Sequence, residues 1–165
     1  MNKSPHAIPP GQDHLIPHLV CENCTEAIEF YKRAFGAQEV HRLPTPDGGR
    51  IMHAALLIGK SFVFLADDFP EYCGGLSQSP KALKGTPVTI HRYVEDCDAA
   101  IQQAQDAGAT VVMPACDMFW GDRYGIVADP YGHKWSIATH VNDLTPDEMV
   151  AGMNAAINAA EGHTS

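Results

Sequence analysis

The stretch HLVCENCTEAI at residues 18–28 returns downstream as HRYVEDCDAAI at residues 91–101. A shift of 73 positions superposes His91 on His18 and keeps a glutamate, a cysteine and an Ala-Ile pair in register. A single similarity at so long a period indicates a duplicated module, because solenoids repeat a shorter unit many times. The duplication therefore decides the fold class before any single motif does.

Each copy predicts a short strand followed by a helix. The strands are expected at residues 15–21 and 88–94. Apolar residues then recur three to four positions apart, which is the period of an amphipathic helix. Gly36 and Gly108 are expected to end the two helices in the left-handed conformation that glycine adopts cheaply. Three further strands complete each copy, at residues 39–43, 52–58 and 61–66 in the first and 110–113, 125–128 and 134–139 in the second.

The duplicated pattern predicts an α+β fold of two tandem βαβββ modules, whose mixed sheets curl into a cupped, open barrel. A C-terminal helix should follow, because Thr145 and Glu148 form a capping box with proline at the first helical position. We expect a flexible N-terminal arm at 1–13, a single domain at 14–141 (module one at 14–68, a connector at 69–86, module two at 87–141), and the C-terminal helix and tail at 142–165.

The charge balance limits the classes of partner. The chain of 165 residues has 11 basic and 20 acidic residues, a formal net charge of -9. This argues against nucleic acid, which is bound by clustered Lys and Arg, and suits a neutral or cationic small-molecule ligand. No apolar run is long enough to span a membrane and no signal peptide is apparent. We therefore expect a cytoplasmic protein whose five cysteines are reduced.

Candidate pocket residues follow from the alternation of side chains along the first strand of each module. In the second module, Thr89, His91 and Tyr93 share the face that we expect to line the concave side. The repeat places His18 at the position of His91, so the two should meet at a pseudo-twofold axis. Such a pair could bind a metal or transfer a proton, or each histidine could be buried and satisfied by a hydrogen bond. His53 belongs to another strand and could face either way.

The segment FWGDRY at residues 119–124 is a second candidate, which we expect to be a loop. Phe119 and Trp120 offer flat apolar area for a planar ligand, while Asp122 and Arg123 offer polar specificity. The alternative is a loop that packs on itself, in which Asp122 and Arg123 form an ion pair that stabilises a turn. We favour a role in lining the pocket.

Four longer motifs carry a family resemblance. They are PHLVCENCTEAIEFYKRAFGA, HAALLIGKSFVFLADD, HRYVEDCDAAIQQAQDAGA and GDRYGIVADPYGHKWSIATH. Together they resemble the vicinal oxygen chelate superfamily of glyoxalase I, bleomycin- and fosfomycin-resistance proteins and extradiol dioxygenases. The closest resemblance is to its PhnB-like branch, often labelled demethylubiquinone methyltransferase-like. The resemblance covers about residues 14–150 and implies paired βαβββ modules, commonly in a homodimer.

The resemblance also implies where a metal would bind. Metal-dependent members use a histidine or glutamine on the first strand of each module and a glutamate on the last. These positions fall on Ile16, Thr89, Val63 and Ser136, which supply no carboxylate. The nearest substitutes for a divalent metal such as Zn, Ni, Mn or Fe are His18, His91 and His53.

Three functions from different classes remain open, with catalytic residues unknown. The first is a small-molecule-binding protein of the bleomycin-resistance type, which the acidic charge and the missing carboxylates favour. The second is a metal-assisted lyase or isomerase of the glyoxalase type, acting on a substrate with vicinal oxygens. The third is a scaffold or subunit-interaction module. The pocket of the first function would be lined by His18, His91, Tyr93, Phe119, Trp120, Asp122, Arg123 and Ser136.

Overall fold

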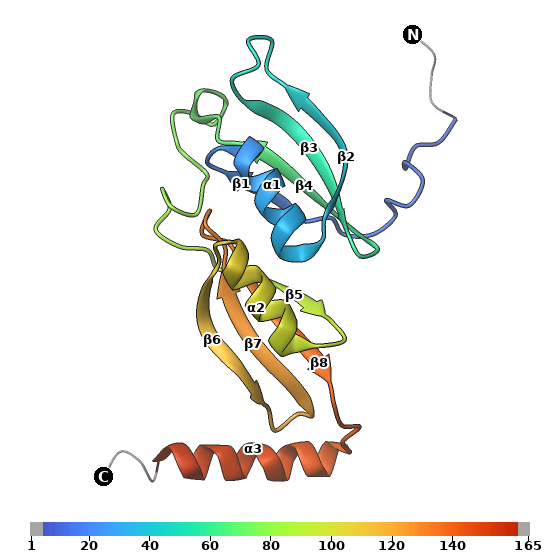
Figure 1. The fold of residues 1–165 in the computed structure, drawn as a ribbon, viewed down its shortest axis with the longest axis vertical. Coiled ribbons are helices and arrows are strands. Elements are labelled where there is room, and N and C mark those ends of the chain that lie inside the picture. The colour runs from blue at the N-terminus through green and yellow to red at the C-terminus, as the bar shows by residue number, and fades with distance from the viewer. Residues whose placement is uncertain (1–4, 162–165) are drawn as a thin grey trace. The chain divides into compact units, whose positions relative to one another are not determined.

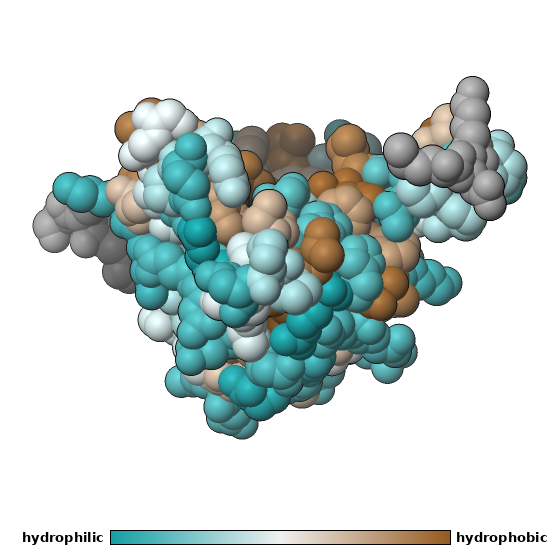
Figure 2. Space-filling model, turned by 90° about the horizontal axis from the view of Figure 1, so that it is seen from above, coloured by the Kyte–Doolittle hydropathy of each residue, from teal (hydrophilic) through white to brown (hydrophobic). Residues whose placement is uncertain are grey.

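The computed structural model describes residues 5–161. They form two compact units, one up to Thr86 and one from Pro87 onward, and each is described by itself (Figure 1). The first residues of the expected arm, 1–4, and the end of the expected tail, 162–165, lie outside the described residues. Within residues 5–161 no helix is long and apolar enough to cross a membrane. Most of the surface seen in Figure 2 is hydrophilic.

The first unit is a four-stranded sheet with one helix. Its strand order is β1-β4-β3-β2, with β1 parallel to β4 and the other pairs antiparallel. A short 3-10 helix, η1, follows the last strand. The elements are β1 (His18–Cys21), α1 (Cys24–Phe35), β2 (Gln38–Pro44), β3 (Ile51–Ile58), β4 (Ser61–Asp67) and η1 (Pro70–Tyr72).

The second unit repeats this topology. Its strand order is β5-β8-β7-β6, again with the first strand parallel to the last. The repetition confirms the predicted fold of two tandem βαβββ modules with curved mixed sheets, followed by a C-terminal helix. The elements are β5 (Thr89–Tyr93), α2 (Cys97–Ala107), β6 (Thr110–Asp117), β7 (Asp122–Ala128), β8 (Lys134–His140) and α3 (Pro146–Glu161).

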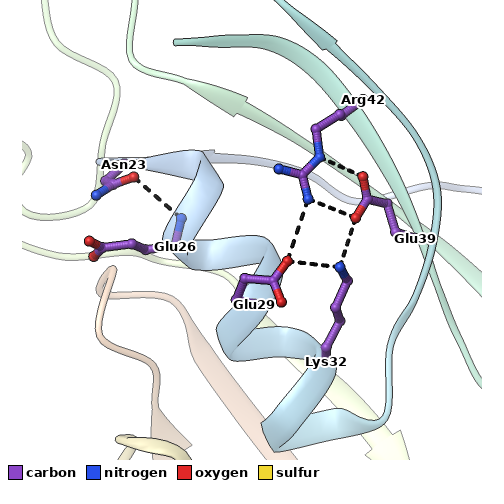
Figure 3. A network of polar contacts seen from close by, with 6 residues as sticks. All are labelled: Asn23, Glu26, Glu29, Lys32, Glu39 and Arg42. Carbon is purple, nitrogen blue, oxygen red and sulfur yellow. Dashed lines mark hydrogen bonds and ion pairs between the residues drawn. The ribbon is translucent and has the colours of Figure 1, made fainter. Parts of the chain in front are cut away.

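Helix α1 is amphipathic and buries one apolar stripe. Its apolar stripe is fully buried, and each large side chain there contributes about 1.5–3 kcal/mol. Asn23 caps the start by accepting a hydrogen bond from the backbone of Glu26 (Figure 3), and Gly36 ends the helix with a φ of 65°. The stripe consists of Ala27, Ile28, Tyr31, Ala34 and Phe35.

A surface ion network ties α1 to β2 (Figure 3). Lys32 lies 2.8 Å from both Glu29 and Glu39, and Arg42 reaches the same two glutamates. Hydrogen bonds from Arg42 and Lys32 lower the pKa of Glu39 to about 2. These side chains are partly exposed, so water screens the network and it adds little to stability.

Several predicted strand limits were wrong. The first strand begins at His18 rather than at Leu15, which is 97% exposed. Strand β6 runs on to Asp117 despite Pro114, because it is an edge strand whose register shifts once before Met113 and once across the proline. Strand β7 already begins at Asp122, so the second half of the predicted loop at 119–124 is part of the sheet.

Candidate functional site

The candidate site lies on the face of the second sheet that α2 does not cover. Along β5, Ile90 and Arg92 are partly buried, whereas Thr89, His91 and Tyr93 are exposed. The register pairs His91 of β5 with Ser136 of β8 and Asp122 of β7 with His140 of β8. Side chains of three strands therefore meet on one open face.

The centre of this face is the Asp122 carboxylate, which is 5% exposed. Tyr93 Oη and Trp120 Nε1 donate hydrogen bonds to its Oδ2, at 2.8 and 3.1 Å. His140 Nδ1 lies 2.8 Å from the other oxygen. Burial by itself would raise the pKa of Asp122, but the bonds from His140, Tyr93 and Trp120 outweigh burial and hold the pKa below its usual value. Asp122 thus accepts bonds as a carboxylate.

His140 lies between two carboxylates. Its Nδ1 faces Asp122, and its Nε2 lies 2.9 Å from Oδ1 of Asp143. The hydrogen bonds to Asp143 and Asp122 raise the pKa of His140 above its ordinary value of 6.5. Both contacts are strongest with the imidazolium, because it donates from both nitrogens.

A dependence of stability on pH follows from His140. The pKa of His140 is higher in the folded state than in the unfolded state. The stabilisation that its charged form gives to the fold is therefore complete below pH 6.5 and is lost as the pH rises through the folded-state pKa. We expect the stability advantage of the parent over His140→Gln, measured by urea unfolding, to shrink across that interval. Asp143→Asn should lower the pKa of His140 in an NMR titration, and an unchanged value would contradict the double contact.

A continuous row of rings, here called the aromatic strip, consists of His91, Tyr93, Trp120 and Tyr124. His91 meets Tyr93 edge-on at 4.7 Å between centroids and stacks on Tyr124 at 6.2 Å. Trp120 meets Tyr124 edge-on at 5.6 Å. His91 Nδ1 also lies 2.8 Å from Oγ of Ser136, which orients its ring. The strip offers apolar ring surface next to fixed polar atoms.

An open hollow adjoins the strip at the carboxyl ends of the parallel strands β5 and β8. Its volume is ≈ 550 Å³, within the range of small-molecule sites. It is lined by Tyr93, Val94, Glu95, Thr139 and His140. Tyr93 therefore belongs to both the strip and the hollow.

The turn that carries Phe119 and Trp120 is held from two sides. The backbone N–H groups of Val141 and Asn142 both donate to the carbonyl oxygen of Gly121, at 2.9 Å. From helix α3, Gly152 packs so closely that a Cβ added there would lie 3.1 Å from Cβ of Phe119. Phe119 in turn meets Trp120 edge-on at 5.0 Å. The chain beyond β8 thus supports the turn.

Arg123 lies apart from this arrangement. It alternates with Asp122 along β7, so its side chain leaves on the opposite face. There its guanidinium pairs with Asp98, in the first turn of α2, and with Asp117 at 3.0 Å. The hydrogen bonds to Asp98 and Asp117 raise its pKa. Arg123 joins the helix to the sheet.

The other candidate residues belong to the first unit. The ring of His18 meets His53 edge-on at 5.8 Å and Phe64 at 6.1 Å. His53 is partly buried and also contacts His41, a residue that the sequence did not single out. His18 and His91 belong to different units, so their meeting across an axis stays a prediction.

The residues do not fit the metal site implied by the family resemblance. The register pairs His18 with Phe64, so Phe64 rather than Val63 corresponds to Ser136 opposite His91. Counting four residues from the hairpin glycine gave Val63, and this was wrong because the hairpin after β3 is shorter than the hairpin after β7. Val63 is buried, with 3% of its surface exposed. Neither Phe64 nor Ser136 supplies a carboxylate. Within residues 5–161, no three or more His, Cys, Asp or Glu side chains are grouped to hold a metal.

One residue of the site, His140, was missed from the sequence, and Tyr124 lay within the candidate segment 119–124 but was given no role of its own. The signal for His140 was the alternation of β8, which puts it on the same face as Ser136. Tyr124 follows Asp122 by two positions on β7, but this spacing had meaning only once the segment was known to be a strand.

Comparison with known proteins agrees with the topology. The model of the Glyoxalase/Bleomycin resistance protein/Dioxygenase superfamily matches residues 11–137. An uncharacterised protein of Mycobacterium bovis is 52% identical over 141 residues, which cover 86% of this chain and 92% of the relative. The chain belongs to this superfamily.

Solved structures show the same fold. TioX from Micromonospora sp. ML1 is 26% identical, with a TM-score of 0.59 over 78% of this chain and 99% of TioX. A gene product from Arabidopsis thaliana is 28% identical, with a TM-score of 0.61 over 76% of this chain and 97% of the other. Because this fold carries unrelated activities, function has to be argued from the site.

Proposed function

We propose that the protein binds a small planar ligand, neutral or cationic, on the aromatic strip of the second unit. The observation that carries this proposal is the buried Asp122 carboxylate, which fixes Tyr93 and Trp120 by hydrogen bonds. Tyr93 nevertheless remains 59% exposed. Exposed rings that are already held in place lose little conformational entropy when a ligand covers them.

The charges around the strip support a neutral or cationic ligand. Glu95 lines the hollow and Asp143 contacts the lining residue His140, whereas the residues that form the strip and the hollow include no Lys or Arg. Arg123 is paired with carboxylates on the other face of β7. A cation over Trp120 or Tyr124 would also gain attraction from the ring faces.

Trp120→Ala tests this proposal directly. We expect the variant to bind proflavine, a planar aromatic cation, more weakly by about 1–3 kcal/mol, because the ring forms one wall of the site. Fluorescence titration measures the affinity. Pyrenesulfonate, a planar anion, should bind the parent more weakly than proflavine does.

The matched control is Tyr72→Ala, which removes an aromatic side chain that is 74% exposed in the first unit. It should leave proflavine binding unchanged. Equal losses in Trp120→Ala and Tyr72→Ala, or preferential binding of the anion by the parent, would contradict the proposal.

The same proposal includes a cytoplasmic homodimer of the PhnB-like branch, with the domain limits expected above. The exposed apolar residues Met149, Met153 and Ile157 of α3 support an interface between subunits, which light scattering would detect.

The alternative function, a metal-assisted lyase or isomerase, lacks support from the residues at the expected carboxylate positions. His18, His91 and Ser136 stay candidates for ligand contact.

A further inference from the structure

We propose that His41 and His53 form a two-histidine binding site for a borderline transition metal ion, of which Zn²⁺ is the test case, on the open face of the first sheet. The site differs from the positions that the family resemblance implies, and it is independent of the proposed ligand site in the second unit. It rests on the placement of two imidazole nitrogens and on a β-bulge that directs one of them.

The two nitrogens lie close enough to bind one ion together. His41 Nε2 and His53 Nδ1 lie 3.1 Å apart, with the ring planes 18° from parallel. Two Zn–N bonds of about 2.0–2.1 Å spanning that separation would meet at roughly 100°, close to a tetrahedral angle. In the metal-free protein one ring donates an N–H to the other ring. When an ion binds, that proton would move to the far nitrogen of its own ring through solvent, so that both facing nitrogens present lone pairs. Water would complete the coordination.

The bulge in β2 explains why His41 is on this face. Glu39 pairs with Leu56, and its carboxylate contacts Lys32 on the side covered by α1. Two positions further, His41 would share that side in a regular strand. The register shift between the two residues turns His41 to the other face, opposite Ala55. Bulges commonly redirect a side chain in this way beside functional sites.

The surroundings hold the His53 ring in place and attract cations. Phe64 meets the His53 ring edge-on at 4.8 Å and limits its rotation. The formal net charge of -9 attracts divalent cations. Imidazole nitrogens prefer zinc, nickel and copper over magnesium.

Calorimetric titration of the full, untagged chain with ZnCl₂ tests the site. We expect one Zn²⁺ per chain, and at least about a tenfold loss of affinity in His41→Ala and in His53→Ala. Mutating a residue that only supports a metal ligand already lowers metal affinity by about tenfold or more. MgCl₂ should give no binding. His14→Ala is the matched control: it removes another histidine of the first unit, one that stacks on Phe62. It should retain the affinity of the parent.

Undiminished Zn²⁺ binding in the double variant His41→Ala/His53→Ala, or a loss as large in His14→Ala, would overturn the site. An NMR experiment on the parent protein avoids any folding defect of the variants. Substoichiometric Ni²⁺ should broaden the imidazole signals of His41 and His53 first, and selective broadening of other histidines would also overturn the proposal. Proflavine binding should be unchanged in His41→Ala, which keeps this test separate from that of the proposed function.

Discussion

Asp122→Ala is expected to lower the free energy of unfolding by about 2–3 kcal/mol and to remove most of the affinity for a planar ligand. The substitution takes one carboxylate away from three donors, Tyr93 Oη, Trp120 Nε1 and the ring of His140. Removing a buried partner costs more than the net value of its hydrogen bonds, because the remaining groups lose their acceptor. Urea unfolding and proflavine titration measure the two effects.

Asp143→Ala is the matched control, because Asp143 contacts the same histidine from a fully exposed position. Its removal should leave the unfolding midpoint close to that of the parent, since water replaces an exposed carboxylate at little cost. If both variants changed the midpoint equally, Asp122 would not organise the site.

Gly121→Ala should have an effect of similar size for a different reason. The residue has a φ of 98°, and a Cβ there would lie 2.4 Å from the carbonyl oxygen of Asn142. Backbone strain of about 1–2 kcal/mol would add to about 1–3 kcal/mol for overpacking. The backbone must shift, and the turn with Trp120 shifts with it. We expect a loss of roughly 2–5 kcal/mol in urea unfolding and a changed near-ultraviolet circular dichroism spectrum.

Gly48→Ala separates the two contributions. Gly48 has a φ of 72°, but nothing lies within 4 Å of an added Cβ. This variant should therefore show only the backbone strain, about 1–2 kcal/mol, with an unchanged spectrum. Equal losses at the two glycines would show that close packing of the turn against Asn142 is not important.

The amino-acid pattern was sufficient for the elements that local sequence determines. The helix stops at Gly36 and Gly108 and the capping box at Thr145 depend on residues within a few positions of one another, and the duplication is visible when the chain is compared with itself. It was less reliable where tertiary structure overrides local signals. The strand predicted at 110–113 ended just before Pro114, but an edge strand can accommodate a proline without losing a paired N–H.

The candidate site could be predicted only in part for the same physical reason. Period-two alternation along a strand was enough to put His91 and Tyr93 on one face. The contacts of Asp122 with Tyr93 and His140 join residues 29 and 18 positions away, and no local pattern reports them. The proximity of His41 and His53 likewise depends on a bulge that turns one side chain over.

The sequence by itself thus determined the βαβββ modules, the buried faces of α1 and α2 and the acidic character of the chain. Only the tertiary structure decided which polar groups became partners, which loop residues became strand, and which face Arg123 occupies. Secondary structure follows from the conformational preferences and periodicity of neighbouring residues. A site instead depends on the register and bulges of strands, which are set by packing between segments far apart in the chain.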